Sequence, residues 1–159
     1  FRGEAWNSKK VLDFGSGSGI LSVACAMFGA KVTGVEIDPL AIDNATENAS
    51  LNQVTERVEF LSDISLVERS SSFDVVIANI LKPVLLGSRR ELLDRLAPGG
   101  TLLLSGLLEK DVESVVLGYE QMAILKGERE YKLNPRSKRV FDLGEWRAVL
   151  WTKGFSPSL

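Results

Sequence analysis

The stretch VLDFGSGSGI, residues 11–20, decides the fold of this chain. Its first four residues are typical of a buried strand, and glycines at positions 15, 17 and 19 follow directly. Glycine permits backbone conformations and close approaches that other residues do not, so this loop can bring its backbone against a ligand. Residues 18–28 then have the apolar spacing of a helix. The loop after such a strand lines the ligand site in open α/β sheets, so it is the first candidate site.

The remainder of the chain alternates between apolar strands and helical segments. The expected strands are residues 9–14, 31–37, 57–63, 73–80 and 101–106, and the expected helices are residues 18–28, 39–52, 83–96 and 110–119. Pro98, Gly99 and Gly100 indicate a turn. Residues 122–133 and 139–151 are expected to be two further strands, joined by residues 134–139. This pattern predicts the α/β class, with a mostly parallel seven-stranded sheet, helices on both faces and a C-terminal antiparallel hairpin.

The bulk composition limits the class of protein. The chain has 159 residues, 45% of them hydrophobic, and a formal net charge of -2, so we expect residues 1–159 to form a single domain. The dispersed charges argue against a protein that mainly coats nucleic acid, and no apolar run is long enough to span a membrane. Cys25 is the only cysteine, which excludes an internal disulfide, favours a small buried residue over a reactive thiol and suggests a cytoplasmic location. The absence of histidine excludes serine–histidine–aspartate triads and histidine-bound metals, and we expect no metal site.

Two classes of cofactor compete for the glycine loop. The dinucleotide pattern GxGxxG requires a third small residue where this chain has Ile20, and that bulk argues against NAD. The glycines fall instead at alternate positions, with Asp13 two residues before the first of them. This DxGxGxG pattern resembles that of methyltransferases that depend on S-adenosylmethionine (AdoMet). A tight turn without a ligand is the alternative, because a glycine-rich loop alone is a weak signal.

AdoMet carries no phosphate, and its ammonium, carboxylate and sulfonium groups need different partners. Asp13, at the end of the first strand, is expected to hold the ammonium, directly or through water. Backbone N–H groups of the loop, which contains Gly15, Ser16, Gly17 and Gly19, are expected to bind the carboxylate.

Acidic residues follow the second and third strands. Glu36 ends the second strand, about twenty positions after the loop, where a carboxylate can accept hydrogen bonds from both ribose hydroxyls; a plain surface carboxylate is the alternative. Its neighbour Ile37 is included in the candidate cofactor site. Asp38, followed by Pro39, is explained as a helix N-cap. Asp63 lies where methyltransferases contact the adenine amino group, although a turn aspartate would show the same pattern.

The fourth strand, FDVVIAN, ends in an amide that follows apolar residues. A buried Asn79 needs hydrogen-bond partners, and a satisfied buried asparagine is one explanation. In the other explanation, its amide oxygen and the carbonyl of Ile80 hold an amine and direct its lone pair at the sulfonium methyl. Deprotonating a lysine amine at pH 7 costs about 4–5 kcal/mol, and desolvation in an apolar pocket can lower that cost without a histidine base. Asn79 and Ile80 are therefore the candidate catalytic residues.

Six segments together resemble the catalytic domain of the PrmA family: VLDFGSGSGIL, GVEIDPLAI, FDVVIANIL, LAPGG, LLLSGLLE and GEWRAVL. They occur in this order between Val11 and Trp151. The resemblance implies a Rossmann-like class I methyltransferase fold, AdoMet as cofactor, and N-methylation of lysine amines of the large-subunit ribosomal protein L-eleven. It also implies that Gly15, Glu36 and Asn79 bind the cofactor, and that Asn79 lies beside the target amine.

The chain departs from the family pattern at three places. Glu36 replaces the usual aspartate, although either carboxylate can bind ribose hydroxyls. The family's N-terminal substrate-recognition domain, and the Gly-Thr-Gly-x-His segment before the first strand, are absent from this sequence. Residues 134–139 lengthen the connection between the last two strands and carry Arg136, Lys138 and Arg139. These residues fit a solvated hairpin tip, or a docking surface for RNA or a protein partner.

Three other functions stay open at this point. The chain can be an AdoMet-dependent methyltransferase of another protein or of a small molecule, or a non-catalytic module that binds AdoMet. An NAD-dependent oxidoreductase is disfavoured by Ile20 and by the lack of a catalytic histidine or a Tyr-x-x-x-Lys motif. A protein partner is expected, and nucleic acid only indirectly, through the ribosome.

Overall fold

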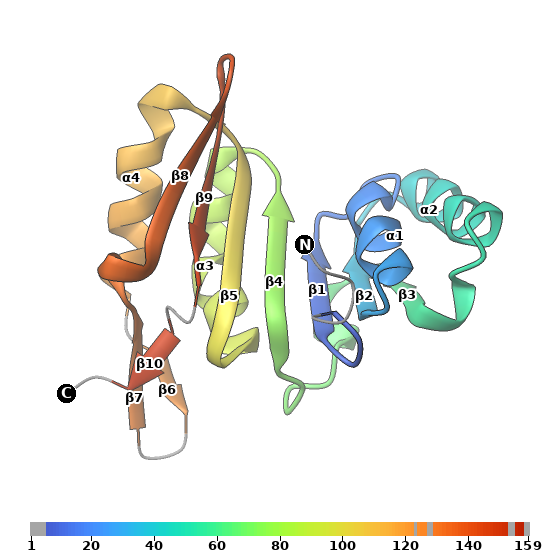
Figure 1. The fold of residues 1–159 in the computed structure, drawn as a ribbon, viewed down its shortest axis with the longest axis horizontal. Coiled ribbons are helices and arrows are strands. Elements are labelled where there is room, and N and C mark those ends of the chain that lie inside the picture. The colour runs from blue at the N-terminus through green and yellow to red at the C-terminus, as the bar shows by residue number, and fades with distance from the viewer. Residues whose placement is uncertain (1–5, 123, 127–128, 153–154, 158–159) are drawn as a thin grey trace. The chain divides into compact units, whose positions relative to one another are not determined.

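The computed structural model describes residues 6–122, 124–126, 129–152 and 155–157 (Figure 1). The chain divides into two compact units, Phe1–Phe73 and Asp74–Leu159. None of the helices in the described ranges has the length and the apolar character needed to cross a membrane.

The first unit contains three parallel strands and two helices. Their bounds are β1 (Lys10–Phe14), α1 (Ile20–Met27), β2 (Lys31–Val35), α2 (Pro39–Leu51) and β3 (Val58–Leu61), with the 3-10 helices η2 (Thr55–Arg57) and η3 (Ile64–Leu66). The strands lie in the order β3-β2-β1, with Val32 opposite both Val11 and Val58. Helix α1 packs on β1 and β2, α2 packs on β3, and the two helices contact each other. This parallel strand–helix repeat places the glycine loop at the carboxyl end of β1.

Local sequence explains where the second helix begins. Helix α2 starts at Pro39, whose missing N–H is no loss in the first turn. The side chain of Asp38 accepts a hydrogen bond from the N–H of Leu40 at 3.0 Å. The prediction that Asp38 caps this helix is therefore confirmed.

The second unit has four strands in one sheet and three in another. Its elements are β4 (Phe73–Asn79), α3 (Lys82–Arg95), β5 (Leu96–Leu108), α4 (Glu109–Glu120), β6 (Ile124–Lys126), β7 (Arg129–Leu133), the 3-10 helix η4 (Pro135–Ser137), β8 (Lys138–Leu143), β9 (Trp146–Trp151) and β10 (Phe155–Pro157). The strand orders are β4-β5-β9-β8 and β10-β7-β6. Strand β9 is antiparallel to both of its neighbours.

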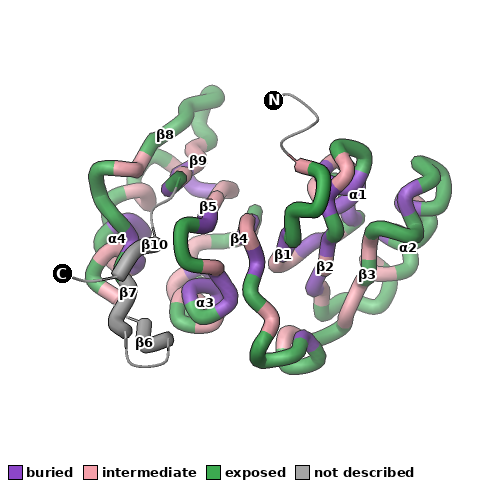
Figure 2. The backbone as a smooth tube through the Cα atoms, turned by 60° about the horizontal axis from the view of Figure 1, so that its bottom comes forward, coloured by how far each residue is buried: buried purple, intermediate pink, exposed green. Residues whose placement is uncertain are grey.

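The core of the second unit lies where α3 and α4 cover β5 and β9. Tyr119 and Trp151 are fully buried and stack with their ring centroids 6.3 Å apart. The Tyr119 hydroxyl donates to the carbonyl oxygen of Leu85 at 2.8 Å, and the Trp151 indole N–H donates to Glu120 at 3.0 Å. Figure 2 shows the buried residues of β5 and α3 in contrast to the exposed strand β8. The core therefore anchors β5 and β9 and leaves β8 largely in contact with solvent.

The predicted α/β class is confirmed, with parallel strands in the first unit and antiparallel strands toward the C-terminus. The three strands of the first unit and the four of the larger sheet in the second make seven, the number expected, although residues 122–133 do not contribute to them. That residues 1–159 act as one domain stays a prediction.

The C-terminal hairpin differs from the prediction in its location. Residues 139–151 do not form one strand, because Gly144 and Glu145 turn the chain back between β8 and β9, with Leu143 opposite Trp146. Gly144 has a φ of 60°, the left-handed conformation that a two-residue hairpin turn needs at its first central position. The predicted antiparallel hairpin exists, but it is contained within β8 and β9.

Two further expectations need correction. The described part of residues 122–133 forms β6 and β7, which pair with each other, and β7 also pairs with β10. Residues 123, 127 and 128 of that predicted strand lie outside the described residues. The predicted turn at residues 98–100 lies inside β5, where Gly99 has a φ of 74°. The glycines therefore mark a local bend and not the boundary of the strand.

Candidate active site

The glycine loop joins β1 to α1 and is fastened to β2. Gly15, Gly17 and Gly19 have φ values of 75°, 52° and 76°, in the left-handed region that favours glycine. The N–H groups of Gly15 and Ser16 both donate to the carbonyl oxygen of Val35, at 2.8 and 3.0 Å. The alternating glycines are therefore required by the backbone path of the loop.

Gly19 lies too close to its neighbours for any side chain. A methyl group there would lie 2.8 Å from Cβ of Ala45 and 2.9 Å from Cζ of Phe60. Ile20, by contrast, is 72% exposed. Ile20 therefore does not fill the packing position between helix and strand that was expected to exclude NAD, because the close packing occurs at Gly19.

Glu36 fixes the loop from the end of β2. One carboxylate oxygen accepts the N–H of Gly17 at 2.9 Å. The other accepts the N–H groups of Ile37 at 2.8 Å and of Asp38 at 3.1 Å. A carboxylate offers about four lone-pair sites, so half-buried Glu36 keeps capacity for one further hydroxyl. Binding both hydroxyls of a ribose requires it to release one backbone N–H. Ile37, beside it, is 81% exposed.

Asp13 lies at the base of the loop as a buried carboxylate. It is 1% exposed, and its Oδ2 accepts a hydrogen bond from the Ser22 hydroxyl of α1 at 2.7 Å. Burial raises the pKa of Asp13, and hydrogen bonds from Ser22 oppose that shift. The sequence allows Asp13 to hold the AdoMet ammonium either directly or through water. Its burial favours the contact through water.

The loop holds a buried polar atom that the protein does not satisfy. Ser16 is 7% exposed, and its Oγ finds no hydrogen-bond partner in the described part of the chain. Buried hydroxyls are normally hydrogen-bonded, so this atom fits a site that a ligand completes. Together with the left-handed glycines and the Glu36 carboxylate, it fits the AdoMet that the sequence predicts.

Asp63 has a local role after the end of β3. Its Oδ1 accepts the N–H of Ser65 at 2.7 Å and so caps the 3-10 helix η3. This hydrogen bond lowers the pKa of the exposed Asp63 carboxyl. The turn role that the sequence allows is present, and the contact with adenine stays a prediction.

In the second unit, Asn79 and Ile80 follow each other at the end of β4. Asn79 is exposed, and no hydrogen bond to its side-chain amide is found among the residues that the structure describes. The explanation of a buried, satisfied asparagine is therefore wrong. Both residues line a pocket of about 560 Å³. The Asn79 amide is thus available to a ligand in that pocket.

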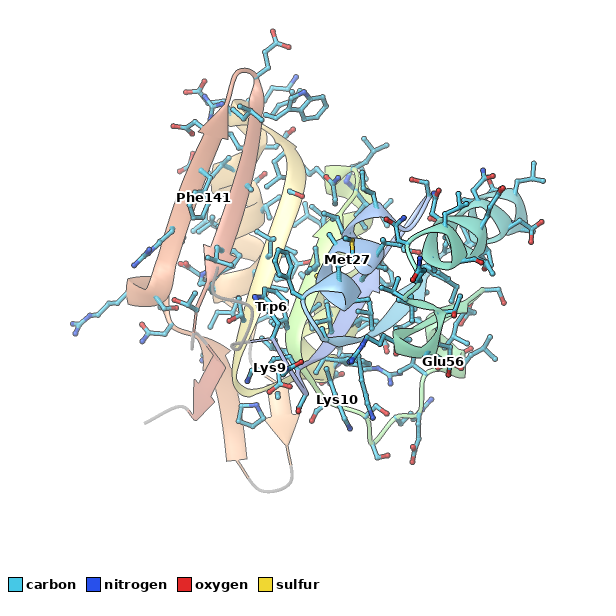
Figure 3. The ribbon with its side chains drawn as sticks, turned by 45° about the vertical axis from the view of Figure 1, so that its right-hand side comes forward. Trp6, Lys9, Lys10, Met27, Glu56 and Phe141 are labelled. Carbon is cyan, nitrogen blue, oxygen red and sulfur yellow. The ribbon has the colours of Figure 1, made fainter. Side chains whose placement is uncertain are left out.

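The walls of this pocket are mostly apolar and aromatic. Besides Asn79 and Ile80 it is lined by Leu81, Ser105, Gly106, Phe141, Asp142, Leu143, Trp146, Arg147 and Ala148. The β8–β9 hairpin supplies most of these residues, and Figure 3 labels Phe141 on it. Arg147 brings no free charge, because it pairs with Asp142 at 2.8 Å and with Glu109 at 3.2 Å. The pocket therefore suits an aliphatic group that ends in one polar atom beside Asn79.

Gly106 is a pocket residue that the sequence reasoning missed. Between the paired positions Leu104 and Leu107, three steps along β5 oppose two along β9, so Ser105 and Gly106 form a β-bulge. Gly106 has a φ of 76°. A glycine inside an apolar strand, as in LLLSGLL, is the signal that points to such a bulge.

Other residues that the sequence singled out have structural explanations. Lys138, the first residue of β8, pairs with Glu120 at 3.3 Å and so is not a free cation. Cys25 is buried, and burial raises the pKa of its thiol to about 11, which confirms the prediction of a small buried residue. Over residues 6–122, 124–126, 129–152 and 155–157, no group of acidic and cysteine side chains could hold a metal ion.

Known proteins match most of the chain. The family model described as ribosomal protein L11 methyltransferase (PrmA) matches residues 4–132. A ribosomal protein L11 methyltransferase from Pelobacter propionicus is 38% identical over 144 residues, which cover 90% of this chain and 43% of that protein. The chain thus spans about two fifths of the length of the curated relatives that it matches.

Solved structures share the fold. A ribosomal protein L11 methylase from Lactobacillus delbrueckii subsp. bulgaricus has a TM-score of 0.74 at 24% identity, over 96% of this chain and 72% of that chain. A SAM-dependent methyltransferase from Geobacter sulfurreducens, in complex with S-adenosyl-L-homocysteine, has a TM-score of 0.56 at 26% identity, over 65% of this chain and 45% of that chain. The Rossmann-like class I methyltransferase fold is confirmed. The family match over residues 4–132, which include the glycine loop and Asn79, shows that the chain belongs to the ribosomal protein L11 methyltransferase (PrmA) family.

Proposed function

We propose that this chain is the catalytic part of an AdoMet-dependent N-methyltransferase that acts on lysine amines of a large-subunit ribosomal protein. The observation that carries the proposal is Asn79, which is exposed, lacks a partner among the described residues and lines an apolar pocket together with Ile80. The relatives are named for ribosomal protein L11, and a solved neighbour carries S-adenosyl-L-homocysteine, the product of methyl transfer from AdoMet. A substrate of this kind implies a cytoplasmic location.

The first unit would hold AdoMet, which supplies a methyl group on an electrophilic sulfonium. Glu36 would accept a ribose hydroxyl. The N–H groups of Gly15, Ser16, Gly17 and Gly19 already donate to protein oxygens, so the three glycines would let the loop backbone approach the cofactor closely, and the Ser16 hydroxyl would bind the methionine carboxylate. Asp13 would act on the ammonium through water. Exposed Ile37 would pack on the adenine, and Asp63 would accept from its amino group. The orphaned Ser16 Oγ and the carboxylate position of Glu36 support this assignment.

The second unit would prepare the amine. A lysine amine has an ordinary pKa of about 10.4 and is protonated at pH 7. Apolar walls disfavour the ammonium form, so the pocket lowers the pKa of the amine and the proton leaves to water. The Asn79 amide oxygen and the Ile80 carbonyl oxygen accept N–H hydrogen bonds and leave the nitrogen lone pair free. Most of the rate would come from this orientation and not from a base.

Methyl transfer to a purified large-subunit ribosomal protein, and to a short lysine peptide, tests the proposal. Mass spectrometry should show methylated lysine with the wild-type chain and AdoMet. At saturating cofactor, Asn79→Ala should turn over about 100-fold more slowly than the wild type, because the amine loses its orientation. Asn44→Ala, at an exposed position of α2, is the matched control and should keep full activity.

The outcomes separate the alternatives. Full turnover by Asn79→Ala removes this residue from the proposed role. A wild-type chain that binds S-adenosylhomocysteine but transfers no methyl group to either acceptor is a binding module and not an enzyme.

A further inference from the structure

Gly106 lies against both oxygen atoms that are proposed to bind the amine. A methyl group on Gly106 would lie 3.0 Å from Oδ1 of Asn79 and 3.2 Å from the carbonyl oxygen of Ile80. The backbone nitrogen of Ile80 would follow at 3.3 Å. The side of Gly106 that lacks a side chain therefore faces the two acceptor oxygens.

A β-bulge brings Gly106 to this place. The extra residue of β5 falls between Leu104 and Leu107, and both bulge residues, Ser105 and Gly106, line the pocket. The φ of 76° at Gly106 is in the left-handed region, which glycine adopts without a steric penalty. Bulges of this kind redirect a strand locally, and here the redirected strand meets the end of β4.

A side chain at this position would change access to the oxygens. An amine that donates to Oδ1 of Asn79 and to the carbonyl of Ile80 must come within about 2.9 Å of each. A methyl carbon at 3.0 and 3.2 Å from the same two atoms would cover the approach to both. The oxygens would then face an apolar group in place of a donor and lose their hydrogen bonds.

We propose that Gly106 is a positioning residue for the acceptor amine, whose missing side chain keeps Oδ1 of Asn79 and the carbonyl oxygen of Ile80 open to an N–H donor. This inference rests on the proposed function, because it takes those two oxygens as the amine site. It adds that β5 controls the access of the amine, separately from the binding of the cofactor.

Gly99 is a matched control in the same strand. Its φ is 74°, close to that of Gly106, but a methyl group there would meet no atom within 4 Å. Alanine at either position therefore carries a similar backbone penalty, whereas only Gly106→Ala covers the acceptor oxygens. The difference between the two variants isolates the effect on the amine site.

Amine binding is measured first, without any need for turnover. The isotope-labelled chain, saturated with S-adenosylhomocysteine, is titrated with a blocked lysine peptide while the Asn79 side-chain amide resonance is followed. The wild type and Gly99→Ala should respond with equal affinity, and Gly106→Ala should bind the peptide at least about tenfold more weakly. Equal affinity of all three proteins, or an Asn79 resonance that does not respond in the wild type, overturns the inference.

Two further measurements distinguish a failure of this inference from a folding defect of Gly106→Ala and from a failure of the proposed function. If Gly106→Ala does not fold, the complex of the wild type with the lysine peptide is examined by NMR. A nuclear Overhauser contact between the Gly106 α-protons and the lysine ε-methylene supports the inference, and its absence overturns it. In methyl transfer, Gly106→Ala should raise KM for the acceptor about tenfold with unchanged affinity for S-adenosylhomocysteine. If the wild type binds the peptide but transfers no methyl group, the proposed function fails. The peptide affinities of the wild type, Gly99→Ala and Gly106→Ala then test the role of Gly106 by themselves.

Discussion

Replacing Glu36 by glutamine tests the group that holds the glycine loop and is proposed to bind the cofactor ribose. The Glu36 carboxylate accepts three backbone N–H groups, from Gly17, Ile37 and Asp38. A glutamine amide of the same length has one acceptor oxygen and one NH2 group, so it cannot accept on both sides. Either the N–H of Gly17 or the N–H groups of Ile37 and Asp38 then face a donor and lose their acceptor.

The magnitude follows from the exposure of these hydrogen bonds. The bond to Gly17 is partly buried, and the bonds to Ile37 and Asp38 are exposed. A hydrogen bond to a charged group contributes about 1.5–3 kcal/mol, and solvent reduces that figure. We therefore expect Glu36→Gln to lose about 1–2 kcal/mol in the free energy of unfolding, which lowers Tm by about 3–6 °C. Loss of the Glu36 carboxylate that is proposed to bind the ribose should weaken S-adenosylhomocysteine binding about 30-fold.

Differential scanning and titration calorimetry measure the two effects. Glu59→Gln makes the same change at an exposed site on β3 and should alter the free energy of unfolding by less than about 0.5 kcal/mol, with unchanged affinity. Unchanged stability and affinity in Glu36→Gln would show that neither the loop contact nor the ribose contact of this carboxylate matters. If Glu36→Gln is less stable but binds S-adenosylhomocysteine with full affinity, the carboxylate holds the loop but does not bind the ribose.

The other predictions concern groups of the first unit. The raised pKa of Asp13 means that its native carboxyl binds a proton more readily than the unfolded one, so stability falls as the pH rises from 3.8 through the raised value. Asp13→Asn should abolish this pH dependence in urea unfolding. Gly19→Ala should cost about 2–4 kcal/mol of unfolding free energy through its clash with Phe60, whereas Gly17→Ala, with open space and a φ of 52°, should cost about 1–2 kcal/mol, both measured by urea unfolding. Cys25, with a pKa of about 11, should react with a thiol reagent near neutral pH no faster than the chain opens.

Local rules explain why much of the first unit was predictable. Glycines at alternate positions have few roles other than a left-handed loop, and the structure places all three of them in that region. The Asp38–Pro39 pair specifies a helix start by chemistry that acts within a few residues, and the cap is present. The position of Glu36 at the end of the second strand was also predictable, because the apolar run before it shows where the strand ends.

Long-range geometry was not predictable from the same residues. Nothing in the local pattern shows that Glu36 reaches back to the N–H of Gly17, because this contact depends on how β1 and β2 pair. The exposure of Asn79 depends on what lies beyond the end of β4. The pattern of residues 139–151 predicts one strand, because the turn at Gly144 interrupts it for only two residues. The place of Gly106 against Asn79 likewise requires the pairing of β5.

If the glycine loop and Glu36 form an AdoMet site, the purified chain must bind the product of AdoMet, and a calorimetric titration measures that binding. The purified chain is titrated separately with S-adenosylhomocysteine and with NAD. We expect that one equivalent of S-adenosylhomocysteine binds and that NAD does not. Binding of NAD without S-adenosylhomocysteine, or binding of neither, would contradict it.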